Sequence, residues 1–77
     1  MAALRYKGYL IIATCQYDRT KSLWRSIVDL SWGSDPYRGS HVIDDSVRSF
    51  QTAEEAQMFG IETGETWVDE RLRRLGP

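Results

Sequence analysis

The feature that most limits how this 77-residue chain can fold is an amphipathic segment from about Thr52 to Leu75. It opens with Thr52-Ala-Glu-Glu55, a capping-box pattern in which the threonine and the glutamate satisfy each other's free backbone N–H groups. A helical period of about 3.6 residues then gathers small and large apolar side chains on one face. The sequence therefore predicts one long helix that packs this face, which includes Ala56, Phe59, Gly60, Gly64 and Trp67, on a sheet.

Two glycines interrupt this pattern, and each costs a helix about 1 kcal/mol relative to alanine. Either the helix breaks at Gly60 and Gly64, or the missing side chains let its backbone approach the sheet closely. Trp67 continues the same apolar face beyond both glycines, which favours close approach.

The first half of the chain is rich in β-branched and aromatic residues. Residues 4 to 17 read as one strand that is apolar on both faces, and a polar turn over residues 18 to 22 leads to a second strand from about Leu23 to Trp32. A glycine-containing loop precedes a short third strand near residues 41 to 44. The predicted fold class is α+β, a single domain over residues 1–77 with a three-stranded antiparallel meander sheet and one C-terminal helix packed on one face.

One helix covers only one face of a sheet, so the predicted second face is open. A domain this small has a modest core, and its single cysteine, Cys15, excludes an internal disulfide. An exposed apolar patch on a small domain is typical of an interface. We therefore expect a self-associating interaction module, a homodimer or the partner of an unknown protein, with its interface at Tyr9, Ile11, Ile27 and Trp32.

Charge suggests an alternative function. The net charge of the chain is −1, but residues 1 to 25 carry a net charge of +4 and residues 26 to 70 one of −8. In the first of these segments aromatic residues lie between the basic ones. Aromatic and basic side chains on a sheet can bind single-stranded nucleic acid by stacking and by phosphate contacts. The candidate contacts for this alternative are Arg5, Lys7, Tyr17, Lys21 and Arg25.

The sequence predicts no enzymatic chemistry. His41 and Cys15 are the only residues of their types, whereas a zinc site needs four ligands and a thiol nucleophile needs a nearby base. The adjacent acids Asp44-Asp45 and Asp69-Glu70 point in different directions, so neither pair converges on one point. We expect no catalytic, metal-binding or cofactor-binding residues and no cofactor.

The expected location is cytoplasmic, without membrane contact. The longest apolar run, from Tyr9 to Ala13, is far shorter than the roughly 20 residues of a membrane span. The first residues lack the basic, apolar and small-residue regions of a signal peptide.

Four segments carry a resemblance to known proteins: Tyr6-Lys-Gly-Tyr-Leu-Ile11, Leu23-Trp-Arg-Ser-Ile-Val28, Ser49-Phe-Gln-Thr-Ala-Glu-Glu-Ala56 and Thr66-Trp-Val-Asp69. Together they resemble a family of short, uncharacterised bacterial proteins with a β-β-β-α domain. More loosely, the aromatic residue in the second strand and the Thr-x-x-Glu-Ala helix start are similar to HicB-type antitoxins. That resemblance implies an antitoxin-like protein that binds a toxin partner, and neither resemblance implies a catalytic residue.

Overall fold

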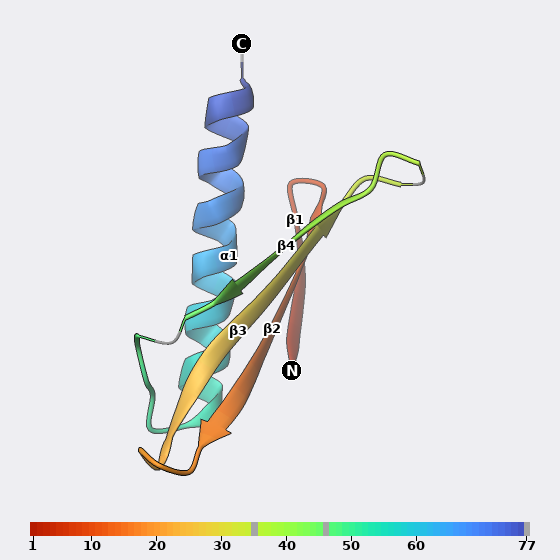
Figure 1. Cartoon of the computed structure of the whole chain (residues 1–77). Coiled ribbons are helices and arrows are strands. Elements are labelled where there is room, and N and C mark those ends of the chain that lie inside the picture. Colours follow the sequence, from red (N-terminus) through yellow and green to blue (C-terminus); the bar gives the residue numbers. More distant parts are fainter. Residues whose placement is uncertain (35, 46, 77) are drawn as a thin grey trace.

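The computed structural model describes residues 1–34, 36–45 and 47–76. Four strands, β1 (Ala2–Tyr6), β2 (Tyr9–Asp18), β3 (Leu23–Trp32) and β4 (Gly39–Asp44), precede one helix, α1 (Ala53–Leu75). The strands pair antiparallel in chain order, and α1 lies on one face of their sheet (Figure 1). The α+β class and the single helix are confirmed, but the prediction of three strands is wrong.

The additional strand comes from a two-residue turn at Lys7 and Gly8. Both have positive φ, 51° and 86°, as in the type I′ turns that fit the twist of a hairpin. Tyr6 and Tyr9 face each other across this turn. The apolar segment from residue 4 to residue 17 is therefore two strands folded back on each other. Some of its apolar side chains contribute to the pairing of β1 with β2.

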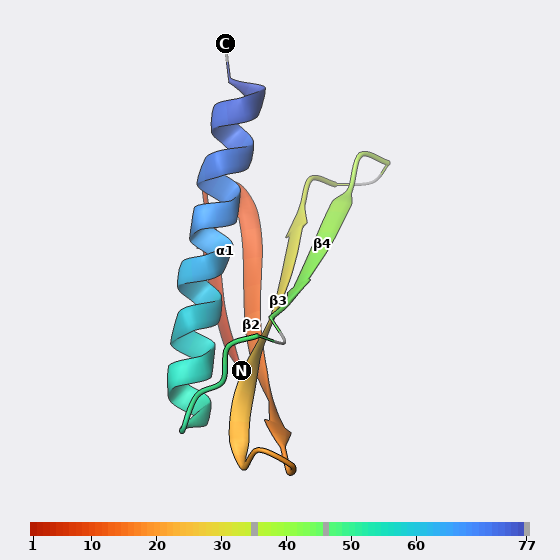
Figure 2. The same cartoon turned by 60° about the vertical axis from the view of Figure 1, so that its left-hand side comes forward.

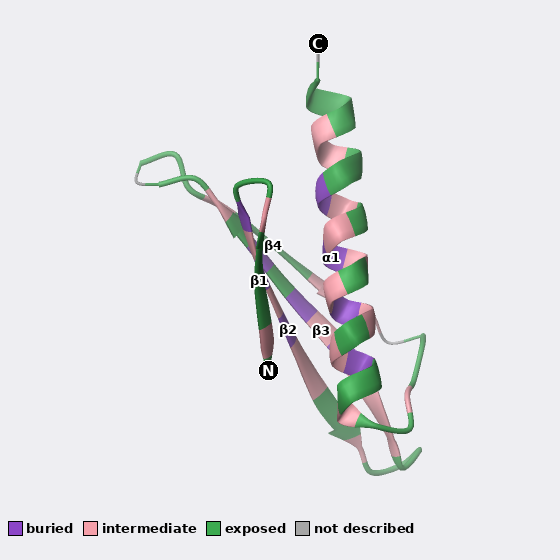
Figure 3. Ribbon diagram, turned by 180° about the vertical axis from the view of Figure 1, so that it is seen from behind, coloured by how far each residue is buried: buried purple, intermediate pink, exposed green. Residues whose placement is uncertain are grey.

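The register of the sheet decides which side chains reach the core. Ile11 lies opposite Leu30, and Ala13 lies opposite Val28, so these four residues share the face toward α1. All four are at most 1% exposed, together with Ala56 and Val68 of the helix. Figure 3 shows the buried positions as a stripe along the side of α1 that faces the central strands.

The helix reaches this face so closely because Gly60 and Gly64 have no side chains. A Cβ at Gly60 would lie 2.7 Å from Ser26 Oγ and 2.9 Å from Ala13 Cβ, and one at Gly64 would lie 2.7 Å from Ile11 Cγ2. Real Cβ atoms essentially never come within 3.0 Å of such neighbours. Because α1 is also continuous through both residues, the expectation of close approach is confirmed.

The start of α1 follows the predicted cap. Thr52 Oγ1 accepts a hydrogen bond from the Glu55 backbone N–H at 3.1 Å, and Thr52 itself is extended. Just before the cap, Phe50 forms an isolated antiparallel bridge with Trp24, with both N···O distances at 2.7 Å. The chain entering the helix is thus attached to β3, which sets where α1 begins.

The close approach at Gly60 and Gly64 places α1 over the middle of the sheet rather than over all of it. The helix packs on β2 and β3 and touches β1, whereas within the described residues its backbone nowhere comes close to that of β4. Figure 2 shows β4 diverging from the helix toward the loop that joins it to β3. One edge strand of the sheet is consequently left outside the helix contact.

The close approach predicts a contrast between two substitutions on α1. Gly60→Leu forces a large side chain against Ala13 and Ser26, and overpacking of this kind costs about 3 kcal/mol or more. Glu62→Leu changes an exposed residue and is expected to cost no more than about 0.5 kcal/mol. Thermal unfolding followed by circular dichroism should show a loss of more than about 10 °C in Tm for the first variant only. Equal losses in both variants would contradict the packing described.

Candidate interaction site

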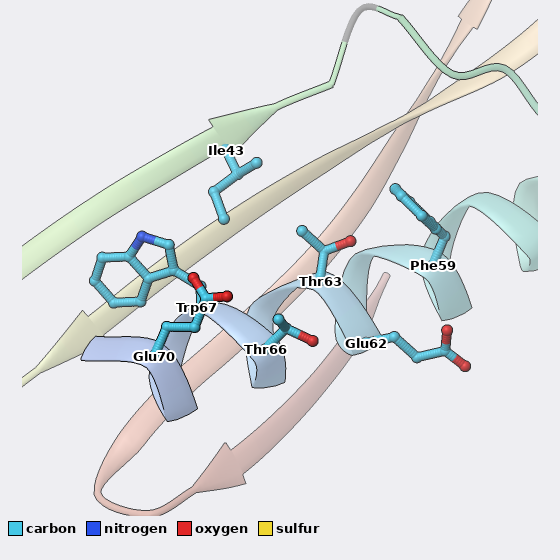
Figure 4. A pocket seen from close by; sticks show the side chains of 7 residues that line it. All are labelled: Ile43, Phe59, Glu62, Thr63, Thr66, Trp67 and Glu70. Atoms are coloured by element: carbon cyan, nitrogen blue, oxygen red, sulfur yellow. The ribbon is translucent and has the colours of Figure 1, made fainter. Parts of the chain in front are cut away.

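An open groove of about 370 Å³ lies between one flank of α1 and β4. Ile43 points from β4 toward the helix, while Phe59 and Trp67 point from α1 toward the sheet (Figure 4). The groove is lined by Ile43, Phe59, Glu62, Thr63, Thr66, Trp67 and Glu70.

The spacing of residues along α1 explains the two sides of this groove. Glu62, Thr66 and Glu70 recur every four residues and so form one polar ridge along the helix. Phe59 and Trp67 belong to the next row, nearer the sheet, where both are half-buried. The lining residues include two carboxylates and no lysine or arginine. The groove therefore combines an apolar floor with an acidic wall.

A cluster of aromatic rings fixes Trp67 at the end of this groove. The ring of His41, on β4, stacks on Trp67 with centroids 4.8 Å apart and planes 13° from parallel. The ring centroids of Trp32 and Trp67 lie 5.6 Å apart, and the Arg71 guanidinium lies 4.5 Å from the centre of the Trp32 ring. Arg71 Nε also donates to the Tyr9 hydroxyl at 3.0 Å. Side chains, rather than backbone packing, thus join β4 to the helix.

The outer edge of β4 presents backbone groups that no described strand pairs with. The Asp45 N–H donates to the Ser26 carbonyl on β3 at 3.3 Å. In an antiparallel pair the hydrogen-bonding direction alternates from one residue to the next. Counting back from Asp45, the backbone groups of Ser40, Val42 and Asp44 point away from β3. This outward set defines the open edge of β4.

The other edge strand, β1, is better protected. Exposed sheet edges are commonly blocked by charged residues, particularly lysine, or by proline. β1 has Arg5 among its five residues, and β4, Gly39-Ser-His-Val-Ile-Asp44, has the carboxylate of Asp44 but neither lysine, arginine nor proline. Val42 is 55% exposed. Of the two edges, β4 is the one that presents a β-branched residue and no positive charge.

A second groove, of about 430 Å³, lies on the opposite flank of α1, where Ala2, Met58 and Ile61 supply its apolar surface. One residue of β1 borders it, just as one residue of β4, Ile43, borders the first groove, and both strands are edges of the sheet. The groove beside β4 differs in the aromatic rings fixed along it and in a strand edge without lysine or arginine. It is the stronger candidate site.

Three of the four residues predicted to form an interface lie on the covered face of the sheet rather than on its open face. Tyr9 is 7% exposed and Ile11 0% exposed, and Trp32 packs against Tyr9 and Trp67, so these three residues lie on the face that α1 covers. Their assignment to the open face is wrong, because β2 pairs with β3 in a register that puts Ile11 beside Leu30. Ile27, opposite Thr14, does lie on the uncovered face, where it is half-buried.

The residues predicted to contact nucleic acid do not form one platform. Arg5 pairs with Leu10 and Arg25 with Gln16, so the two arginines lie about 20 Å apart along the uncovered face. Tyr17 is on the opposite face and packs edge-on against Trp24, and Lys21 lies in the turn between β2 and β3. Lys7 is in an ion pair with Asp69 at 2.7 Å. The structure does not bring the five residues together.

The residues considered for catalysis are also separated. Cys15 pairs with Ser26 and His41 with Leu30, which places them about 13 Å apart along the strands and two strands apart across the sheet. In the described part of the chain, no three histidine, cysteine or acidic residues lie close enough to hold a metal ion. Nor does any described helix combine the length and apolar character needed to cross a membrane.

Comparison with known proteins adds no family to these observations: no protein-family model, curated protein or solved structure matches the chain.

One charged cluster connects the first turn of the sheet to the helix. The Asp69 carboxylate accepts hydrogen bonds from Lys7 Nζ at 2.7 Å and from the Tyr6 hydroxyl at 2.9 Å. Hydrogen bonds from Lys7 and then Tyr6 hold the pKa of Asp69 below its ordinary value of 3.8, and the bond to Asp69 raises the pKa of Lys7 above 10.5. Both charged groups are solvent-exposed, so their contribution to stability is small and screened by salt.

The direction of the Asp69 shift predicts a pH dependence. A depressed pKa in the folded state stabilises the protein above the unfolded-state value near 3.8, and this contribution is lost as pH falls through the lower folded-state pKa. Asp69→Asn should therefore lower Tm slightly at neutral pH, with the difference from the native chain shrinking as pH falls below 3.8. Thermal unfolding of both proteins across this range measures the effect. A difference that persists unchanged at low pH would mean that the charge of Asp69 is not responsible.

Proposed function

We propose that this chain is a non-enzymatic interaction module that binds an extended polypeptide segment along the open edge of β4. The observation that carries the proposal is the combination of an unpaired strand edge with an apolar groove directly beside it. Adding a strand to an exposed edge is a common way in which domains recognise peptides. The backbone supplies affinity, and pockets for alternate side chains supply specificity.

The geometry of β4 supports this mode of binding. A strand added at Ser40, Val42 and Asp44 would satisfy their outward backbone groups. Side chains of a strand point alternately to the two faces of its sheet. Every second side chain of the added strand would thus lie on the face toward α1, next to Ile43 and within the groove.

The composition of the groove supports a particular kind of segment. Ile43, Phe59 and Trp67 favour apolar side chains, while Glu62 and Glu70 on the helix ridge favour lysine or arginine. A segment that alternates apolar and basic residues on its helix-facing side matches both. Acidic side chains on the helix-facing side of the segment would be repelled by the two carboxylates.

The alternative of a catalytic site has less support from the same residues. His41, the only histidine of the sequence, has its ring stacked on Trp67, and the only thiol lies on β2 at the other end of the sheet. The groove offers recognition surfaces rather than a convergent acid and base.

Selection of binders from a random-peptide display library tests the proposal. We expect the selected peptides to combine apolar and basic residues in alternating positions and to alter the fluorescence of Trp67 on binding. Val42→Pro removes an outward N–H without removing a bond to β3, since proline is tolerated on an edge strand where its nitrogen faces solvent. This variant should weaken peptide binding about tenfold or more, which corresponds to about 1.4 kcal/mol.

Ala3→Pro on β1 is the matched control. Counting from the Tyr6–Tyr9 pair that closes the first turn, Ala3 also directs its backbone groups outward. Peptides that bind β4 should bind this variant as they bind the native chain. Selected peptides that lose affinity for Ala3→Pro and retain it for Val42→Pro would overturn the assignment of the site to β4.

A further inference from the structure

We propose that the segment that pairs with β4 is the β4 strand of a second copy of this chain, antiparallel to it and with Val42 opposite Val42 of the second copy. This inference rests on the proposed function, because it uses the same strand edge and names its occupant. On the side that faces α1, the second copy brings Ile43 to the apolar floor but no lysine or arginine to Glu62 and Glu70. It makes the protein a symmetric homodimer with a continuous eight-stranded sheet.

The backbone of β4 is suited to pairing with itself. A two-fold axis brings identical surfaces together, so each group must find its partner on the same strand of the other copy. With the axis at Val42, the outward groups of Ser40, Val42 and Asp44 meet the same set in the antiparallel direction. Ser40 of one copy lies opposite Asp44 of the other, and the two Val42 residues face each other.

Side chains on the uncovered face of the sheet also match in this register. The two Val42 side chains, each 55% exposed in the single chain, cover one another across the axis. The Ser40 hydroxyl comes opposite the Asp44 carboxylate, to which it can donate a hydrogen bond. The Val42 contact lies on the axis and occurs once, whereas the Ser40–Asp44 contact occurs twice, once on each side of the axis.

On the face toward α1, His41 comes opposite Ile43 of the second copy. Each of these residues already borders its own groove, since His41 stacks on Trp67 and Ile43 forms part of the floor. The apolar surface of the two copies therefore becomes continuous across the new strand pair. Cross-strand pairs of aromatic and β-branched residues stabilise antiparallel sheets.

Other registers fit less well. Moving the axis to His41 places the two imidazole rings opposite each other, sets Gly39 opposite Ile43 and removes the Ser40–Asp44 contact. A shift that pairs odd-numbered with even-numbered residues turns the side chains of one strand to the wrong face. The side-chain chemistry of β4 thus favours the axis at Val42 over the axis at His41.

Single-cysteine variants test the register, in a Cys15→Ser background that removes the chain's own thiol. With the axis at Val42, Val42→Cys brings two thiols directly opposite each other, at a Cα separation of about 5.5 Å that permits a disulfide. Ser40→Cys, on the same face of the same strand, leaves its two thiols about 14 Å apart along the strands. Mild oxidation followed by a non-reducing gel should show a covalent dimer for Val42→Cys and a monomer for Ser40→Cys. Efficient cross-linking at Ser40→Cys, or none at Val42→Cys, would overturn the register.

Sedimentation equilibrium tests whether the occupant is a second copy. The native chain should form a dimer below a concentration of about 1 mM, and Val42→Lys, which places two positive charges opposite each other, should raise the dissociation constant about tenfold or more. Circular dichroism checks that the variant remains folded, and Val42→Thr, which keeps a β-branched side chain, should remain dimeric. A native monomer at about 1 mM, or a dimer indifferent to Val42→Lys, would overturn the inference. If such a monomer still bound selected peptides at β4, the proposed function would stand while this inference failed.

Discussion

The contact between α1 and the sheet at Gly60 and Gly64 is the constraint on which the rest of the structure depends. The absence of two side chains lets the helix backbone settle over Ala13, Ser26 and Ile11 at distances where a Cβ would collide with them. Each glycine costs the helix about 1 kcal/mol in propensity, and the close packing of the core over β2 and β3 offsets this cost. The helix cannot move sideways toward β4 without giving up these contacts.

The location of the helix in turn determines what remains exposed. With α1 over β2 and β3, β4 is held to the helix by the stacking of His41 on Trp67 and not by backbone packing. A groove opens between them, and the polar ridge of Glu62, Thr66 and Glu70 forms its outer wall. The proposed binding edge thus follows from the same two glycines that build the core. The core and the candidate site therefore both result from the close approach of α1 to the sheet at Gly60 and Gly64.

The helix could be predicted from the sequence because several local signals agree. The capping box at Thr52, the periodic apolar face and the glycines all indicate the same element, and the structure has α1 from Ala53 to Leu75. The first hairpin could not be predicted in the same way, because Lys7-Gly8 lacks the asparagine or aspartate that usually marks a type I′ turn. Without that turn the segment from residue 4 to residue 17 reads as one strand. Its two apolar faces then give no basis for choosing between Tyr9 and Leu10 as core residues.

The location of the candidate site could not be predicted for a related reason, although the second turn contains a signal for the register of β2 and β3. Asp18 pairs with Leu23 across the second turn, and this register alone places Ile11 opposite Leu30 on the core face. The four-residue spacing of Glu62, Thr66 and Glu70 is visible in the sequence, but it becomes the wall of a groove only once β4 is known to lie outside the helix contact. The edge position of β4 is a property of the whole sheet, which local patterns do not contain.

Amide hydrogen exchange measured by NMR at several protein concentrations tests the central claim most directly. The Ile43 N–H points toward β3 and should be protected at every concentration, because it belongs to the sheet of the single chain. The Val42 N–H points to the open edge, so it should exchange rapidly in dilute solution and become protected as the protein is concentrated. Rapid exchange of Val42 at all concentrations, in a protein whose Ile43 remains protected, would contradict the pairing of β4 with a second copy.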